Sequence, residues 1–205
     1  MTPLARESER LQEILSLFYA GRTSRDETRS AVIDVFLQRL HCARVSLWKF
    51  SGEDDDLSLL CFASKSAGGT LDTSERRLMR SEYRDYFNAL IERGTYLSVD
   101  AMRDPALQAM RASYLVPNNV LSMLDAAFLL NGRAYGMICC EETAAQRHWR
   151  PSDVTALRAI ATRLAAMMSG QTDSVLWTTP SVPLKTMPST PVAAPPGRPA
   201  SDRRS

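Results

Sequence analysis

Apolar residues recur at helical spacing near both ends of the chain, and this pattern predicts helices there. The first helix is expected over residues 4–20, where the apolar residues fall on one stripe at coiled-coil spacing. A second helix is expected from Ser24 to about residue 40, because Ser24 and Glu27 have the spacing of a capping box. A last helix is expected near the end of the apolar region, with Ser152 as its N-cap and a stripe that continues to Met168.

Between these helices the pattern changes to short apolar runs and to alternation, which predicts strands. Residues 43–50 and 57–65 are expected to form a hairpin around an acidic turn, and residues 96–100 a short strand. The segment SMLDAAFLLNGRAYGMICCEE, residues 122–142, is typical of two strands joined at Asn131-Gly132, the dipeptide that a type I′ turn favours. Further helices are expected between the strands at residues 81–93 and 106–115.

The order of these elements predicts an α+β domain. We expect an antiparallel sheet of five to six strands with the terminal helices on one face. The irregular, aromatic segment between the second and fourth strands is long enough to wall a ligand pocket on the other face. The expected organisation is an N-terminal helix at residues 1–22, a folded domain at 23–170 and a disordered, proline-rich tail at 171–205.

The tail changes the picture of charge and of partners. Prolines recur from Pro180 to Pro199 with few large apolar residues, a composition that favours disorder with polyproline II character. A docking site for a proline-reading partner is the alternative to a passive tail. The formal net charge of +2 arises within residues 171–205. The balanced remainder has no net attraction for nucleic acid, so nucleic-acid binding is not expected, except as a salt-sensitive property of the tail.

Composition gives the expected compartment. No apolar run approaches the roughly 20 residues of a membrane span, and the charged N-terminus lacks a signal-peptide core. The four cysteines show no disulfide framework, so we expect buried, reduced thiols in a cytoplasmic protein. Cys139 and Cys140 are neighbours on a strand and should point to opposite faces, which disfavours a shared metal ion. The acidic turn at residues 53–56 lacks the ligand spacing of a calcium loop, so no metal site is expected.

Asp125 is the residue that the apolar pattern singles out, because it interrupts a strand that is otherwise almost entirely apolar. Counting from a two-residue turn places Asp125 opposite Ile138, on a face with Met123, Ala127, Gly136 and Cys140. A buried carboxylate must be hydrogen-bonded or paired. We expect it to accept backbone N–H groups from the loop at Asn118-Asn119 or to pair with an arginine. The alternative is a polar contact in a ligand pocket. Acid–base catalysis is not expected, because the sequence places no second titratable partner.

Six further residues are candidates for lining a pocket. Each also has a simpler structural interpretation, as a core residue for the aromatic side chains and as a turn cap for the aspartate. They are Trp48, Phe62, Tyr83, Phe87, Asp100 and Tyr114.

Five blocks in fixed order resemble a known family: ARVSLWKF, SEYRDYFNALIERG, YLSVDAMRDPALQAM, SYLVPNNVLSMLDAAFLLNGRAYGMICCEE and the WRPSD entry to the last helix. From about Thr28 to Ser169 the chain resembles a GAF domain, of the type found in bacterial sensor histidine kinases and diguanylate cyclases. The resemblance implies a six-stranded antiparallel sheet, a small-molecule pocket on one face and terminal helices that form a homodimer on the other.

The chain also departs from the family pattern. Ala127 stands where the family usually has proline, and no output-domain signature follows Gly170. The nucleotide-binding signature of phosphodiesterase GAF domains is not recognisable, and neither is the Cys-His bilin site of phytochromes, since His41-Cys42 lies at a helix end. The resemblance therefore implies no particular ligand or cofactor.

The sequence predicts a non-enzymatic, cytoplasmic, bacterial-type sensory module. It would bind a small molecule and pass a conformational change to a signalling partner. One alternative is a protein-interaction adaptor with a vestigial pocket, filled by side chains such as Trp48, Phe62 and Tyr83. A second is a thiol enzyme akin to the methionine sulfoxide reductases of this fold, which would need two cysteines converging in one pocket.

Overall fold

The structure is a computed structural model that describes residues 3–53, 56–130 and 133–168. Its α-helices are α1 (Pro3–Tyr19), α2 (Arg25–Leu40), α3 (Arg84–Arg93) and α4 (Pro151–Met168). Its strands are β1 (Arg44–Ser51), β2 (Ser58–Ser66), β3 (Leu71–Asp72), β4 (Arg76–Met79), β5 (Thr95–Ser98), β6 (Ser122–Leu130) and β7 (Arg133–Glu142). Two short turns of helix, η2 (Pro105–Met110) and η3 (Arg111–Leu115), follow β5.

All strand pairs are antiparallel, and the sheet order is β3-β2-β1-β7-β6-β5, with β4 also paired to β2. The predicted α+β class is confirmed. Over the described residues the sheet has seven strands, more than expected, because the polar segment after β2 contributes β3 and β4. Leu78 is buried on β4, and this single apolar anchor is too little for a sequence pattern to reveal a strand.

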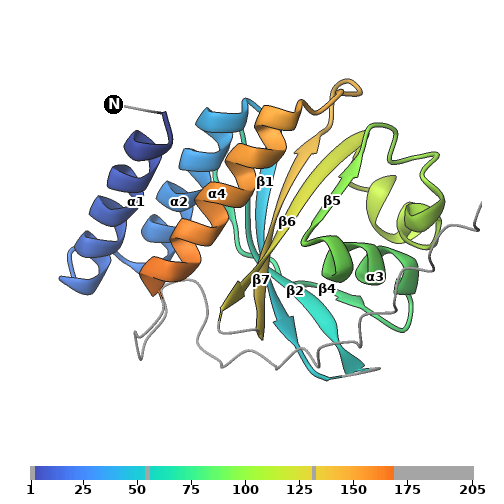
Figure 1. The fold of residues 1–205 in the computed structure, drawn as a ribbon, viewed down its shortest axis with the longest axis horizontal. Coiled ribbons are helices and arrows are strands. Elements are labelled where there is room, and N and C mark those ends of the chain that lie inside the picture. Colours follow the sequence, from blue (N-terminus) through green and yellow to red (C-terminus); the bar gives the residue numbers. More distant parts are fainter. Residues whose placement is uncertain (1–2, 54–55, 131–132, 169–205) are drawn as a thin grey trace, which may run out of the picture.

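The molecule is layered, as Figure 1 shows. Helices α2 and α4 pack on one face of the sheet, which we call the helix face, and α1 packs on the outside of α2 and α4. Helix α3, η2 and η3 lie on the opposite side, which we call the front face. The predicted placement of the terminal helices on one face is confirmed. Each face has its own apolar core.

Local sequence signals account for the helix ends. Ser24 accepts a hydrogen bond from the backbone N–H of Glu27, whose carboxylate accepts one from the Ser24 N–H in return, so the predicted capping box is confirmed. Helix α4 begins at Pro151, where the missing N–H costs nothing. Ser152 therefore lies inside the first turn, and its prediction as N-cap is wrong. The carboxylate of Asp153 instead accepts a hydrogen bond from the Arg150 N–H.

Two bulges shift side chains relative to simple counting. In the β6–β7 pair the register changes between Phe128 and Leu129, which leaves Tyr135 as an extra residue on β7. Asp125 therefore pairs with Cys139, and the prediction that it faces Ile138 is wrong. Its face carries Met137 and Cys139, whereas Cys140 belongs to the helix face. The predicted Asn131-Gly132 turn lies outside the described residues.

The predicted helix at 106–115 is present only as a 3-10 turn, η2, followed by a π-turn, η3. Asp104 caps η2 by accepting from the N–H of Ala106, ahead of Pro105. Within the described residues, no helix has both the length and the apolar character needed to cross a bilayer.

Candidate functional site

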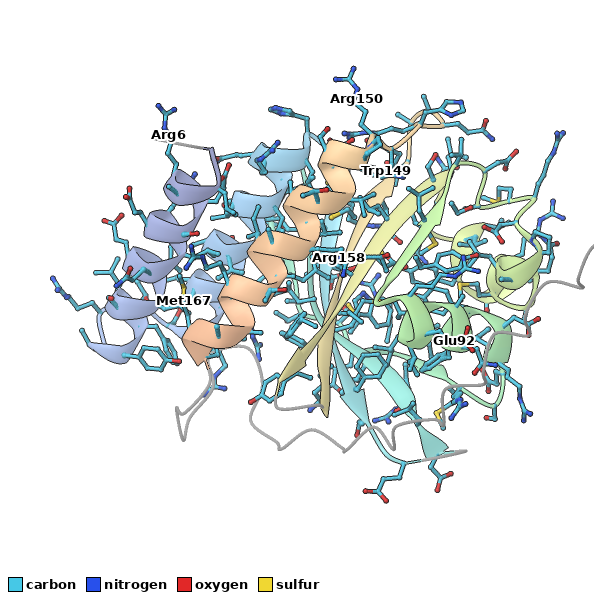
Figure 2. The ribbon with its side chains drawn as sticks, in the orientation of Figure 1. Arg6, Glu92, Trp149, Arg150, Arg158 and Met167 are labelled. Atoms are coloured by element: carbon cyan, nitrogen blue, oxygen red, sulfur yellow. The ribbon has the colours of Figure 1, made fainter. Side chains whose placement is uncertain are left out.

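The front face is the candidate site, because the sequence placed its pocket there. Strands β1, β2, β6 and β7 form its floor, and α3 with residues 99–121 forms its cover. Figure 2 shows side chains crowding the space between the sheet and α3. The front core consists of buried aromatic and apolar side chains, among them Trp48, Phe50, Tyr83, Tyr86, Phe87, Tyr96, Leu107, Met110, Tyr114 and Met137.

Asp125 lies on β6 in this floor and has no exposed surface. Its Oδ2 accepts a hydrogen bond from the hydroxyl of Tyr86 on α3 at 2.8 Å. Its Oδ1 is buried without a well-formed hydrogen bond. Burial raises the pKa of Asp125 to about 7, although the Cys139 thiol and the Tyr86 hydroxyl each lower it. The carboxylate thus anchors the cover to the sheet through Tyr86, rather than through the expected Asn118-Asn119 loop or an arginine.

Glu141 is a second buried carboxylate, which the sequence reading missed. Its Oε2 lies 2.6 Å from Nε of Arg44, and its Oε1 accepts from the hydroxyl of Tyr114 on η3 at 2.7 Å. Burial lowers the pKa of Arg44, but the neighbouring Glu141 outweighs burial and the net shift of the pKa is upward, so the Arg44 guanidinium stays protonated. Burial and then Glu141 raise the pKa of Tyr114. The acidic pair Glu141-Glu142 at a strand end resembled a solvated terminus, so nothing in the pattern marked it.

A polar strip continues from this ion pair to the edge of the sheet. Arg44 also approaches the backbone carbonyl of Asn118 at 3.4 Å, and the Asn118 side-chain oxygen accepts from Arg76 at 3.4 Å. Arg76 on β4 contacts Ser64 at 2.8 Å and Asp72 at 3.1 Å as well. The sequence reading missed Arg76, because β4 itself was not predicted.

Four of the candidate aromatic residues come together on the front face. The ring of Trp48 lies edge-on to that of Tyr114, with centroids 6.0 Å apart, and the Trp48 indole N–H donates to Ser46. The hydroxyl of Tyr83 lies 3.0 Å from that of Ser113, and Phe87 is fully buried. The most exposed of the four, Tyr83, retains 8% of its surface. The floor and cover therefore fill their shared volume with their own side chains.

Two candidates lie elsewhere. Phe62 belongs to the helix-face core and stacks under Arg29 of α2, 5.0 Å from ring centroid to guanidinium carbon. A bulge in the β1–β2 pair, where Leu47 pairs with Ala63 and Trp48 with Cys61, leaves Phe62 as the extra residue of β2. Its expected role in filling a front pocket does not hold. Asp100 is half-buried in the turn after β5, where its backbone carbonyl accepts from the Arg103 N–H and its carboxylate lies 3.9 Å from Nε of Arg103.

The cysteines are all free and buried. Cys139 points to the front face and Cys140 to the helix face, which confirms their predicted opposition. Burial raises the pKa of Cys61 to about 11 and those of Cys139 and Cys140 well above the usual thiol value. Within the described ranges, no three His, Cys, Asp or Glu side chains are grouped to hold a metal ion.

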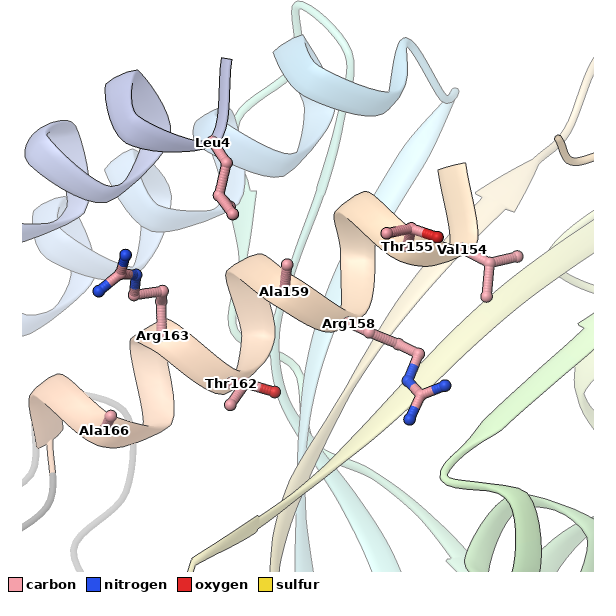
Figure 3. Close-up of a pocket in the computed structure, with 8 residues that line it drawn as sticks. All are labelled: Leu4, Val154, Thr155, Arg158, Ala159, Thr162, Arg163 and Ala166. Carbon is pink, nitrogen blue, oxygen red and sulfur yellow. The ribbon is translucent and has the colours of Figure 1, made fainter. Parts of the chain in front are cut away.

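Two cavities open on the helical side of the molecule. One, of about 500 Å³, lies along the outer surface of α4 beside α1. Figure 3 shows its lining: Leu4, Val154, Thr155, Arg158, Ala159, Thr162, Arg163 and Ala166. The other, of about 300 Å³, lies between α1 and α2 and is lined by Arg6, Glu7, Arg10, Val35, Gln38, Arg39 and His41.

The loop before α4 contacts three elements of the fold through Arg147. Arg147 pairs with Glu142 at 3.0 Å and with Asp153 at 3.1 Å, and it donates to the carbonyl of His41 at 3.2 Å. Its guanidinium also lies 4.2 Å from the ring centroid of Trp149. Figure 2 shows Trp149 at the start of α4. Arg147 thus joins the ends of α2, β7 and α4.

Solved structures with this architecture are numerous. The phycocyanobilin-bound GAF domain of a cyanobacterial phytochrome aligns with a TM-score of 0.60 at 15% identity, covering 80% of this chain and 93% of that one. The PixJ GAF domain of Thermosynechococcus elongatus, in its blue-light absorbing form, aligns with a TM-score of 0.53 at 16% identity, covering 69% of this chain and 87% of that one. At such identities the likeness concerns the fold.

The chromophore-binding domain of the bacteriophytochrome RpBphP3 from R. palustris also aligns, with a TM-score of 0.59 at 14% identity, covering 81% of this chain and 60% of that one. A search of curated proteins finds no match. The GAF domain family model matches residues 24–168, which run from the N-cap of α2 to the end of α4. On that match, and with the layered fold described above, the chain belongs to the GAF domain family.

Proposed function

We propose that this chain is a non-enzymatic, cytoplasmic sensory module in bacterial-type signal transduction. Its front face binds a small molecule when the cover moves, and a partner protein reads the resulting change at the helices. The observation that carries this proposal is the pair of buried carboxylates, each bonded to a tyrosine of the cover: Asp125 to Tyr86 and Glu141 to Tyr114.

Such polar contacts are a costly way to build a core. Apolar side chains of the same volume are often as stabilising as a buried ion pair, or more so. Hydrogen bonds to a moving cover, however, define one closed position, and a ligand that offers its own donors can replace them. The unpaired Oδ1 of Asp125 already has capacity for one such donor.

The sheet offers a direct route from the front face to the helices. Asp125 alternates along β6 with Leu124 and Ala126, which belong to the helix-face core together with Leu157 of α4. A ligand that binds more tightly when the cover is displaced would favour a different conformation of β6. Because β6 packs against α4, the position of α4 would change with it. Helix α4 ends at Met168, where the tail begins.

Related folds support a small-molecule role. Two of the aligned structures contain a bilin, biliverdin in one and phycocyanobilin in the other. Our proposal does not extend to a thiol-linked bilin. The described cysteines are buried, and the raised pKa values of Cys61, Cys139 and Cys140 disfavour the reactive thiolate.

Native mass spectrometry of the freshly purified full chain tests the proposal, because it reports bound small molecules and stoichiometry together. We expect a non-covalent adduct that is lost in the Glu141→Gln variant and retained in Asp72→Asn, whose carboxylate lies at the sheet edge. A chain that carries no adduct from cell extract, and whose melting temperature responds to no compound of a metabolite library, would contradict ligand sensing.

A second candidate function is an adaptor that binds proteins and no small molecule. The filled front face favours it, since Trp48, Tyr83 and Phe87 are buried against neighbouring side chains. Heteronuclear NMR separates the two functions. Ligand sensing predicts exchange broadening in residues 99–121, whereas an adaptor predicts a rigid cover and partner-induced shifts on α1 and α4 only.

Homodimerisation through the terminal helices belongs to the same proposal. The apolar stripe of α1 is already used within the chain, since Leu11 and Leu15 are buried. A second copy would therefore meet the outer surface of α4 and the exposed Leu4 and Tyr19 of α1. Analytical ultracentrifugation over a range of protein concentrations tests this part separately.

A further inference from the structure

The groove along the outer surface of α4 is a built surface that the proposed ligand site does not use. Its floor is made of small side chains from successive turns of the helix, Thr155, Ala159, Thr162 and Ala166. Leu4 of α1 closes one side and is 37% exposed. Arg163 rises on that side and Arg158 on the other, as Figure 3 shows. Neither arginine has an ion-pair partner among the described residues.

We propose that residues 171–177 of this same chain, QTDSVLW, fold back along α4 and occupy this groove. The segment begins three positions after Met168, the last residue of α4, so its effective concentration at the groove is high. It contains Val175, Leu176 and Trp177, the large apolar residues that precede the proline-rich stretch. It also contains an acid, Asp173, whereas the later tail is basic apart from Asp202.

Chain geometry gives the register. The proposal requires a chain reversal at residues 169–170, and Gly170 is suited to one because glycine adopts positive φ without steric cost. With Asp173 beside Arg163, Trp177 lies four residues further along an extended chain, about 13 Å away. Nine residues of α-helix, from Arg163 back to Val154, span about 13.5 Å. Trp177 therefore reaches the upper end of the groove, beside Val154 and Arg158, where an indole can pack on aliphatic surface and face a guanidinium.

The consequence is self-occlusion. The surface of α4 that a second copy would use is covered in the isolated chain, and a partner that reads the proline-rich tail would uncover it. This inference concerns only the outer surface of α4. It can therefore be right or wrong independently of whether a ligand binds at the front face.

Tryptophan fluorescence of the full chain tests the docking. Trp48 and Trp149 are 1% and 7% exposed, so the difference between wild type and Trp177→Phe isolates the signal of Trp177. We expect a blue-shifted Trp177 component whose acrylamide quenching constant is several-fold below that of the QTDSVLW peptide. Asp173→Arg should raise that constant, and Arg163→Asp combined with Asp173→Arg should restore protection. Asp202→Arg is the matched control for the charge change and should have no effect.

Two results would overturn the proposal. The first is a Trp177 in the full chain that is quenched as readily as the free peptide. The second is protection that disappears on dilution, because it would mean that the segment docks on a second copy rather than on its own chain. Circular dichroism of each variant establishes that a loss of protection does not come from unfolding.

Discussion

At the residue scale, the front face is organised by carboxylates that sit where water cannot reach them. Asp125 was recognisable from sequence, because an acid inside an apolar run has few explanations. Its partner was not, since Tyr86 lies 39 residues away and on a helix. Glu141 escaped notice for a related reason: its partners Arg44 and Tyr114 are distant in sequence. Residue types are local information, whereas hydrogen-bond partners depend on the finished fold.

Replacing Asp125 by asparagine should change how stability depends on pH. An unfolded aspartate titrates near about 3.9, whereas the folded pKa is about 7. Between these values the native state holds a proton that the unfolded state has lost, so wild-type stability falls as pH rises, by up to about 1.4 kcal/mol per pH unit. Asp125→Asn removes this slope. Urea unfolding at pH 5, 6, 7 and 8 measures it, with the exposed Asp26→Asn as control. Parallel curves for wild type and Asp125→Asn would contradict the raised pKa.

Glu141→Gln should destabilise the domain, because it leaves the charge of Arg44 buried without its counter-charge. Breaking one side of a buried ion pair costs about 3–5 kcal/mol. The matched change Asp72→Asn breaks the pair with Arg76, in which the aspartate side chain is 47% exposed, and should cost less than about 1 kcal/mol. Urea unfolding at pH 7 compares the two. Equal losses would mean that Glu141 is better solvated than its burial indicates.

At the element scale, hydrophobic periodicity predicted the longer helices and strands, but it could not predict β-bulges, in which one strand has an extra residue relative to its partner. Phe62 and Tyr135 each stand where two residues of one strand oppose one residue of the next. Such bulges move every later side chain of the strand to the other face by comparison with simple counting. The error at the partner of Asp125 follows from this. Strands β3 and β4 were missed because they have only two and four residues, too few to show an alternating pattern.

The capping box at the start of α2 provides a test at the same scale. Ser24→Ala removes the side-chain acceptor for the Glu27 N–H and should lower the free energy of unfolding by about 1 kcal/mol. Ser152→Ala is the matched control, because Ser152 lies within the first turn of α4 and is exposed, so its change should be near zero. Thermal unfolding of both variants measures the difference. A larger loss in Ser152→Ala would mean that α4 begins one residue later.

At the scale of the whole molecule, α1 forms an outer layer that packs on α2 and α4. From sequence, residues 1–22 were expected to form a separate helix. An apolar stripe at coiled-coil spacing indicates that the helix packs against another helix, but it does not identify which helix. The structure supplies a partner within the chain. The family match begins only at residue 24, yet α1 covers apolar side chains of the helix face that would otherwise meet water.

Leu11→Ala should therefore destabilise the whole domain rather than only α1. Leu11 is fully buried among the helices, and truncating such a residue costs about 2–5 kcal/mol. Leu97→Ala is the matched control, because Leu97 on β5 is 42% exposed and its loss should cost far less. Chemical unfolding followed by both far-UV circular dichroism and tryptophan fluorescence measures the effect. If the fluorescence midpoint were unchanged in Leu11→Ala, α1 would be energetically independent of the rest.

The strand order has one last implication, for how this protein meets others. Within the described residues, the sheet ends in β3 and β4, of two and four residues, on one side and in β5, of four residues, on the other. An incoming strand needs a long row of free backbone N–H and C=O groups to pair with, and neither border offers one. Strand addition, fibril growth and exchange of β-hairpins between copies are accordingly disfavoured. Recognition by other macromolecules is left to side chains on the helices, where single substitutions can tune it without disturbing the sheet.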